Sequence, residues 1–318
     1  MINLNGLNIK LLGDAHLGKS FKNGVPLHRR GEREALVWEE FWQKLSDAPE
    51  EGVHVNLGDL FNQPHVSYDL IFDTALVYCR QAELKPLCHF IILKGNHDYT
   101  RDLEKKSAFD IFAALVSRHE NITIITDGLV LPYGEKWLGF VAWHPLATAE
   151  EIIRTVGKCD VLFGHLDIHP LSDPHNLIPT KLLSELGVTT VYTGHDHLPR
   201  IEVRDGVTIN VVGSMQPYSH SEDPDELLYV TRDLATVRAN PDNYLDKCLR
   251  IELAPGEKLD FDVDCLQLTL KKAGVEEEDI SVQMDEFNLD RLLEESLVDI
   301  DEGIGMLVRD KYQELRSR

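Results

Sequence analysis

The sequence has no long apolar run. No stretch of about 18 consecutive apolar residues, the length that a membrane-spanning helix needs, occurs in the 318-residue chain. The first residues also lack a basic stretch that leads into an apolar segment, so no signal peptide is expected. The sequence therefore predicts a cytoplasmic protein that does not associate with a membrane.

Cysteine is scarce as well. The five cysteines are widely scattered, odd in number and without a CxxC pair, which argues against a disulfide framework and against a structural zinc site. They are predicted to be buried free thiols, as a reducing cytoplasm favours: Cys79, Cys88, Cys159, Cys248 and Cys265.

Basic residues are few relative to acidic ones, 32 against 54, and the formal charge is -22. An evenly acidic surface would repel nucleic acid, because nonspecific affinity for phosphates comes mainly from Lys and Arg. The excess is concentrated, however: residues 256–318 hold 18 Asp and Glu against 8 Lys and Arg, a net charge of -10. This tail is either a solvated acidic face or a docking surface for a basic partner.

The first two thirds of the chain alternate short apolar runs with amphipathic stretches, and no internal repeat or low-complexity segment interrupts them. This alternation predicts a layered α/β domain. Helices are expected at 34–45 and 68–82, where apolar residues recur every three or four positions. Strands are expected at 9–12, 53–57, 90–93, 122–125, 138–143, 161–163, 189–192 and 207–212.

The mixed polar stretch 232–246, which contains Pro241, indicates a connection between domains. Beyond it, Leu259, Phe261, Val263 and Cys265 alternate with acidic residues, and apolar residues at 292–300 follow a helical spacing. We therefore expect a first domain at 1–235 and a small acidic α/β domain at 245–318.

Polar side chains that can bind a metal follow the predicted strands. Because ligands at the carboxyl ends of parallel strands converge at one edge of a sheet, we expect these groups to meet. Imidazole, carboxylate and one amide oxygen suit manganese, iron or zinc. Taken singly each is weak evidence, since a lone histidine is more often structural; their joint occurrence carries the argument: Asp14 and His16, Asp59, Asn96 to Asp98, His165, and His195 and His197.

An Asp such as Asp59 can bridge two cations. Two such ions roughly 3.5 to 4 Å apart polarise a phosphoryl oxygen and generate hydroxide near neutral pH. If Asp14 and Asp59 are the anionic ligands, two divalent ions leave the site with a charge of about +2. Such a site would attract a phosphate even in an acidic protein.

These motifs resemble those of the calcineurin-like metallophosphoesterases, whose pattern is DxH, GDxx, GNHD, GH and GHxH in that order, and the match runs from Asp14 to His197. Within the superfamily, residues 14–18, 58–61 and 213–217 resemble the SbcD-type DNA repair exonucleases, which include phage versions and the nuclease of the eukaryotic MRN complex. The resemblance implies a β-sandwich flanked by helices, with the small C-terminal α/β domain as an appendage. It also implies that the protein is located in the cytoplasm of a bacterial cell or of a phage-infected host.

The resemblance further implies two metal positions that share Asp59. Manganese is expected first, with magnesium, iron or zinc as alternatives. His97 would stabilise the transition state or protonate the leaving oxygen, and Asp98 would orient its ring. The first metal would be held by Asp14, His16, Asp59 and His197, and the second by Asp59, Asn96, His165 and His195.

One departure concerns the substrate side of the site. Several family nucleases have a histidine three residues after the bridging Asp, whereas this chain has Asn62, which can hydrogen-bond a phosphate but cannot shuttle a proton. His65 is a candidate substitute, although a plain loop residue is the simpler interpretation. His144, at the end of a predicted strand, is interpreted as a buried structural histidine.

Arg29 and Arg30, just after the first metal motif, could bind the phosphates of a DNA backbone, since Arg pairs well with phosphate oxygens. The alternative is a salt-bridge cluster with Glu32 and Glu34, and the sequence does not decide between them.

The leading hypothesis is a metal-dependent DNA exonuclease or endonuclease of repair, recombination or phage DNA metabolism. The resemblance implies DNA as substrate, a coiled-coil ATPase subunit of the SbcC type as partner, and a homodimer. The alternative is a phosphatase or small-molecule phosphodiesterase, because the same motifs serve monoesters and diesters. A scaffold that lost its chemistry would not need the full ligand set.

Overall fold

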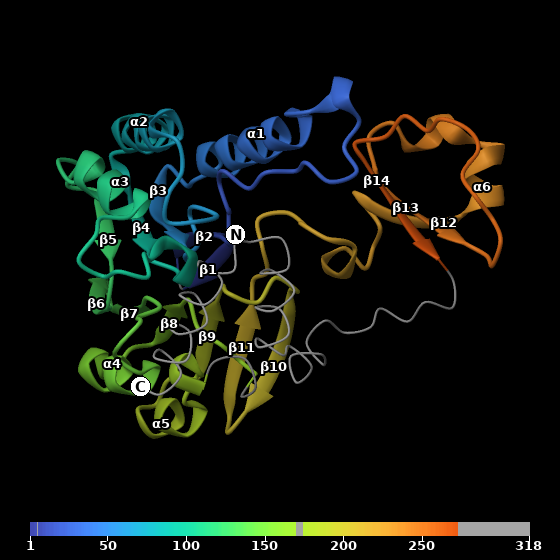
Figure 1. Ribbon diagram of the computed structural model, residues 1–318. Coiled ribbons are helices and arrows are strands. Elements are labelled where there is room, and N and C mark those ends of the chain that lie inside the picture. The colour runs from blue at the N-terminus through green and yellow to red at the C-terminus, as the bar shows by residue number, and fades with distance from the viewer. Residues whose placement is uncertain (5, 170–173, 273–318) are drawn as a thin grey trace, which may run out of the picture. The chain divides into compact units, whose positions relative to one another are not determined.

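The computed structural model describes residues 1–4, 6–169 and 174–272. The chain divides into two units, Met1–Ile251 with Leu259–Leu270, and Glu252–Lys258 with Lys271–Arg318. Nearly all secondary structure described below lies in the first unit (Figure 1).

The first sheet has five strands in the order β1-β2-β3-β4-β5: Ile2–Leu4, Leu7–Leu12, Glu51–Asn56, Leu87–Leu93 and Ile122–Ile125. Strands β2 to β5 are mutually parallel, and β1 pairs with β2 in an antiparallel hairpin. The helices between the parallel strands are α1 (Glu32–Ser46), α2 (Tyr68–Leu84) and α3 (Ala108–Val116). Because the strands follow one another in sequence order and crossovers are right-handed, all three helices fall on one face of the sheet.

The second sheet has six strands in the order β10-β11-β9-β8-β7-β6, and β7, β8, β9 and β11 are mutually parallel. Helices α4 (Ala149–Val156) and α5 (Thr180–Glu185) are its crossovers and, by the same rule, cover one face of it. The strands are Gly128–Tyr133 (β6), Lys136–Val141 (β7), Val161–Gly164 (β8), Thr190–Thr193 (β9), Arg200–Arg204 (β10) and Val207–Val211 (β11).

Three apolar layers hold the two sheets and their helices together. The middle layer joins the sheets: Val53, Val55 and Ile91 from the first pack with Phe140 and Phe163 from the second. One outer layer lies under α1, α2 and α3, and the other under α4 and α5 (Figure 1). In α1 the buried residues Val37, Phe41 and Leu45 recur every four positions, which produces one apolar face. The expected β-sandwich flanked by helices is confirmed.

A third sheet, of order β12-β13-β14, contains Tyr229–Asp233, Cys248–Leu253 and Gln267–Lys272. The predicted connection at 232–246 is not a plain linker, because it contains helix α6 (Leu234–Ala239) and a 3-10 turn at Pro241–Tyr244. Residues 259–265 form no strand despite their alternation; the strand begins at Gln267. The helical spacing at 292–300 lies outside the described residues, and the domain boundary stays a prediction.

The five cysteines are buried and free, as predicted. Among the helices that the structure describes, none combines the length and the apolar character that crossing a membrane requires.

Candidate metal centre

The predicted ligands lie at the carboxyl ends of five parallel strands. Asp14 and His16 follow β2, Asp59 follows β3, and Asn96 follows β4. His165 follows β8, and His195 and His197 follow β9. The parallel arrangement brings these loops to a common edge, where their side chains form groups compact enough to hold a cation.

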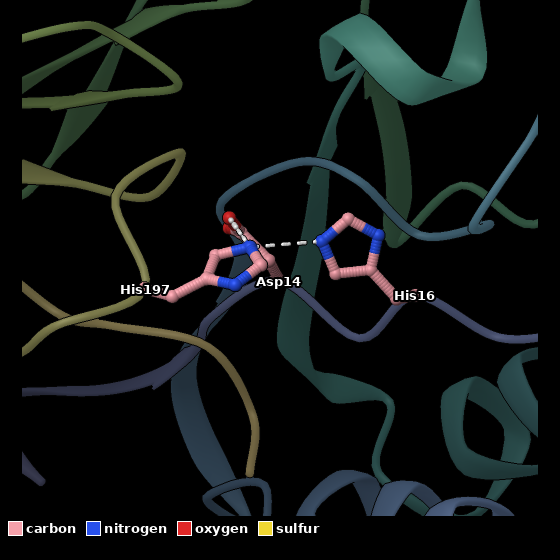
Figure 2. Close-up of side chains that lie close together, drawn as sticks. All are labelled: Asp14, His16 and His197. Atoms are coloured by element: carbon pink, nitrogen blue, oxygen red, sulfur yellow. Dashed lines mark hydrogen bonds and ion pairs between the residues drawn. The ribbon is translucent and has the colours of Figure 1, made fainter. Parts of the chain in front are cut away.

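The first group consists of Asp14, His16 and His197 (Figure 2). The two Nε2 atoms of His16 and His197 lie 3.0 Å apart, and His197 Nε2 lies 3.6 Å from Asp14 Oδ2. Asp14 and His16 are almost completely buried, and Asp14 Oδ2 also accepts the backbone N–H of His195 at 2.9 Å.

The second group consists of Asp59, His165 and His195. The side-chain oxygen of Asn96 joins it, 2.9 Å from His165 Nε2 and 3.0 Å from His195 Nδ1. The two histidine nitrogens are 3.2 Å from each other. The side-chain oxygen of Asn96, which was predicted as a ligand of the second metal, therefore lies beside the rings of His165 and His195.

Asp59 stands between the two groups. Its Oδ2 lies 3.8 Å from His16 Nε2 and 3.5 Å from His165 Nε2, so one carboxylate oxygen faces a histidine of each group. Its Oδ1 accepts the backbone N–H of His97 at 2.9 Å, which fixes the carboxylate. This geometry suits a carboxylate that bridges two cations.

The donor set fits divalent cations. His165 Nδ1 lies 2.9 Å from the carbonyl oxygen of Leu57, to which it can only donate, so the Nε2 lone pair of the neutral ring faces the Asn96 oxygen and Asp59. Asp14 Oδ1 is buried and makes no hydrogen bond within the described residues. Acceptor atoms that face one another in a buried site repel, and a bound cation would accept their lone pairs and remove this repulsion.

Burial also keeps the rings of His16 and His165 neutral, and a histidine must be neutral to bind a metal. Burial lowers the pKa of His16 to about 3 and lowers that of His165. Burial and the neighbouring Asp59 raise the pKa of Asp14. Burial alone would raise the pKa of Asp59 too, but His165 and His16 outweigh it and hold the pKa below its usual range.

Backbone strain coincides with the site. Five residues other than glycine have a positive φ in the described parts of the chain, and three of them are predicted ligands: His16 at 45°, Asp59 at 46° and His195 at 75°. L-residues adopt this conformation at a cost, and it persists where the surroundings enforce it. The positive φ values therefore coincide with the loops that carry the predicted ligands.

Two glycines allow the loops to approach. Gly58 has a φ of 116°, and a Cβ atom there would collide with the ring of His165. A Cβ at Gly95 would collide with Asp59. The glycines of the second and third motifs thus clear space for the ligands.

His97 lies beside the first group and is exposed. Its Nδ1 is 2.8 Å from the carbonyl oxygen of Asn62, and its ring meets that of His16 edge-on at 4.8 Å. His97 also forms a compact group with His16 and Asp59, so its ring is within reach of a cation at the first position.

The predicted pairing of Asp98 with the ring of His97 is wrong. The Asp98 carboxylate accepts the backbone N–H groups of Leu60, Phe61 and Gly95, at 3.0 to 3.3 Å. Asp98 thus ties the Asp59 loop to the Asn96 loop, and the carbonyl of Asn62 takes over the orienting role at His97. Burial and Asp59 raise the pKa of Asp98 to about 8.

For Arg29 the structure shows the salt-bridge alternative, and its DNA contact stays a prediction. Its guanidinium bonds Glu32 at 2.8 and 3.0 Å and the carbonyl of Leu245, which is the salt-bridge alternative. Glu34 does not join this cluster but accepts the backbone N–H of Phe21. Arg30 is exposed, and its role stays a prediction.

Two further histidines lie in loops. His144 is partly buried, and its Nδ1 accepts the backbone N–H groups of Leu146 and Ala147, so its role is structural. His65 is exposed.

The sequence did not reveal two carboxylates behind the ligands. Glu222 Oε2 lies 3.2 Å from Nδ1 of His197, and Asp167 Oδ2 lies 3.2 Å from Nε2 of His195. Asp167 lies two residues after the predicted ligand His165, and this short spacing could have identified it. No sequence spacing identifies Glu222.

A layered α/β sandwich with adjoining His–Asp groups at the carboxyl ends of its strands is the arrangement of a metal-dependent phosphoesterase. The family model of the calcineurin-like phosphoesterases matches residues 7–199, and the chain belongs to this family. The family uses divalent metals for phosphoester hydrolysis, and the two groups could bind them.

The solved structures to which the chain is similar are distant. Phosphopantetheinyl hydrolase from Mycobacterium tuberculosis is 12% identical with a TM-score of 0.38, over 66% of this chain and 93% of that one. A putative 5'-nucleotidase from Staphylococcus aureus is 14% identical with a TM-score of 0.38, over 65% and 48%. GAP50 of Plasmodium is 16% identical with a TM-score of 0.38, over 66% and 72%. At these values the likenesses say nothing about substrate. No curated protein matches the chain significantly.

Proposed function

We propose that the chain is a metal-dependent DNA nuclease that hydrolyses phosphodiester bonds. The observation that carries the hydrolytic part is the single Asp59 oxygen that faces a histidine of both groups. The DNA part rests on the SbcD-like residues at 14–18, 58–61 and 213–217. The segment 213–217 contacts the first group of predicted ligands, since Met215 N–H donates to the carbonyl of Asp14 at 2.9 Å.

In this proposal Asp59 would help to hold both cations. Bound divalent ions supply Lewis acidity toward a phosphoryl oxygen and a water of lowered pKa. The Nδ1–H of His97 is held by the Asn62 carbonyl, so Nε2 is left for the substrate. In its doubly protonated form the ring donates the Nε2 proton to the leaving oxygen and becomes the neutral ring that keeps its Nδ1–H. The remaining ligands would be Asp14, His16 and His197 for one cation and Asn96, His165 and His195 for the other.

The acidic balance of the chain favours a second candidate, a phosphatase or small-molecule phosphodiesterase. With a net charge of -22, the chain itself offers little basic surface for a long polyanion. A nuclease of this composition would gain from a partner that supplies the basic surface, and an ATPase subunit of the SbcC type is the proposed one. DNA degradation by the purified chain should then increase when such a subunit is added.

A substrate panel separates the two candidates. Protein loaded with manganese would be offered linear single-stranded and double-stranded DNA, a chromogenic phosphate diester and a monoester, each with and without chelator. The proposal expects chelator-sensitive cleavage of DNA and of the diester. Hydrolysis confined to the monoester would support the second candidate, and a metal-loaded protein that hydrolyses none of them would contradict both.

A further inference from the structure

Each group of predicted ligands has a carboxylate behind one of its histidines. Glu222 lies 3.2 Å from Nδ1 of His197, on the side of the ring away from the Nε2 atom that faces Asp14 and His16. Asp167 lies 3.2 Å from Nε2 of His195, whose Nδ1 faces Asn96 and His165. The two histidines thus turn opposite nitrogens toward the site.

We infer that Glu222 and Asp167 are positioning residues that fix the tautomer and orientation of His197 and His195 for metal binding. A carboxylate that accepts a ring N–H holds the proton on that nitrogen, so the other nitrogen offers its lone pair. The inference rests on the metal-binding part of the proposed function, not on the identity of the substrate.

The surroundings of Glu222 favour this role. Its Oε2 also accepts the backbone N–H of Tyr218 at 2.9 Å, and its Oε1 accepts the Ser219 hydroxyl at 3.0 Å. Both oxygens of the Glu222 carboxylate are therefore held in place by the backbone and side chain of its own segment.

The same segment encloses the first group. The Tyr218 ring contacts both His16 and His197 edge-on, with centroids 5.5 and 6.1 Å away, and its hydroxyl donates to the carbonyl of Ala15. Glu222 consequently connects the residues just after the SbcD-like segment 213–217 to the orientation of His197. Asp167 is less than a tenth exposed and belongs to the loop that also carries His165.

Two measurements on the full chain test the inference. Manganese affinity would be measured by titration calorimetry, with bound metal counted by elemental analysis, for the wild type, Glu222→Ala and Glu222→Gln. We expect Glu222→Ala to weaken one of two sites by about 10- to 100-fold. Glu222→Gln, whose amide oxygen can still accept from His197, should recover most of that loss. Asp225→Ala, which removes an exposed carboxylate from the same segment, should bind like the wild type.

The second measurement needs no metal. Long-range nitrogen–proton NMR on histidine-labelled protein in chelator reports which ring nitrogen carries the proton. We expect the Nδ1–H tautomer at His197 in the wild type and in Glu222→Gln, and a mixture in Glu222→Ala. At His195 the Nε2–H tautomer should likewise be lost in Asp167→Ala and kept in Asp167→Asn.

The outcomes distinguish the two proposals. Unchanged tautomers and unchanged affinity in both alanine variants would overturn the inference, as would equal losses in Glu222→Ala and Glu222→Gln. A wild type that binds no manganese would instead refute the proposed function. In that case the tautomer measurement alone decides whether Glu222 and Asp167 orient the rings.

Discussion

At the scale of single residues, the proposed function assigns the binding of cations and the protonation of the leaving oxygen to different residues. Asp59 faces a histidine of each group and is buried, whereas His97 is exposed and anchored to a backbone carbonyl. Asp59→Asn should therefore lose most bound metal, because an amide does not replace a bridging anion. His97→Ala should keep its metal and lose about 10²- to 10⁴-fold in turnover, the usual contribution of a general acid.

Metal content by elemental analysis and turnover on the diester measure this difference. His65→Ala, which removes an exposed histidine from a nearby loop, serves as the control and should leave both quantities unchanged. Since His97 also lies within reach of the first position, equal metal loss in His97→Ala and Asp59→Asn would show that His97 is a ligand.

The sequence identified the candidate ligands because their types and order are local signals, each placed after an apolar run. It could not predict the partners of Asp98, since a carboxylate beside a histidine in sequence can equally accept backbone N–H groups of another loop. Nor could it place Glu222, because its proximity to His197 depends on how the segment after the second sheet folds back. Contacts between distant loops are settled by the tertiary fold.

At the scale of elements, strand β3 carries an unusual core residue. Val53 and Val55 point into the layer between the sheets, while His54 is fully buried and packs against Phe90 at 5.6 Å. Neither ring nitrogen of His54 makes a hydrogen bond within the part of the chain that the structure describes. Burial, with Lys10 and Lys85 nearby, lowers the pKa of His54 to about 3.

This histidine should make the fold acid-sensitive. The unfolded chain takes up a proton at His54 near pH 6.5, whereas the folded chain does so only near pH 3, so the free energy of unfolding falls as the pH drops between these values. His54→Leu should remove about 1 to 2 kcal/mol of the loss between pH 7 and pH 5. Urea unfolding of both proteins at both pH values, in chelator, measures it; parallel pH dependences would contradict the prediction.

Helix α2 offers a place to test the expected homodimer. Tyr68, Phe72 and Leu76 recur every four residues along it and are 81%, 59% and 55% exposed. If the homodimer implied by the SbcD resemblance forms through this stripe, Phe72→Glu should weaken it at least tenfold, since central aromatic residues dominate interface energies. Light scattering after gel filtration gives the mass, and Ile201→Glu, on an exposed position of β10, is the matched control. Equal masses for all three proteins would contradict the prediction.

The elements themselves were largely predictable. All eight expected strands and both expected helices are present, because the strands are short apolar runs and the helices bury the face that their three- and four-residue spacing reveals. The prediction for 232–246 was wrong, since Pro241 and the surrounding polar residues concealed the six-residue helix Leu234–Ala239. The alternation at 259–265 failed because no neighbouring strand pairs with it in the described residues. Alternation predicts a strand only where the sheet offers an edge.

At the scale of the whole molecule, the site is built from loops of both sheets. The first group joins loops after β2 and β9, and the second joins loops after β3, β4, β8 and β9. A cation in either group therefore links one sheet to the other. Without a cation, the buried oxygen Asp14 Oδ1 has no hydrogen-bond partner within the described residues.

Binding of divalent cations should therefore stabilise the whole sandwich. A ligand at 100 times its dissociation constant that binds only the folded state adds about 2.7 kcal/mol per site to the free energy of unfolding. For a chain of this size that corresponds to a rise of about 4 to 8 °C in Tm. Differential scanning calorimetry with manganese and with chelator measures the shift, and Asp59→Asn should abolish most of it. A shift that persists in Asp59→Asn would place the stabilising cation outside the site. No shift in the wild type would contradict binding of manganese to the folded chain, because a ligand that binds only the folded state always stabilises it.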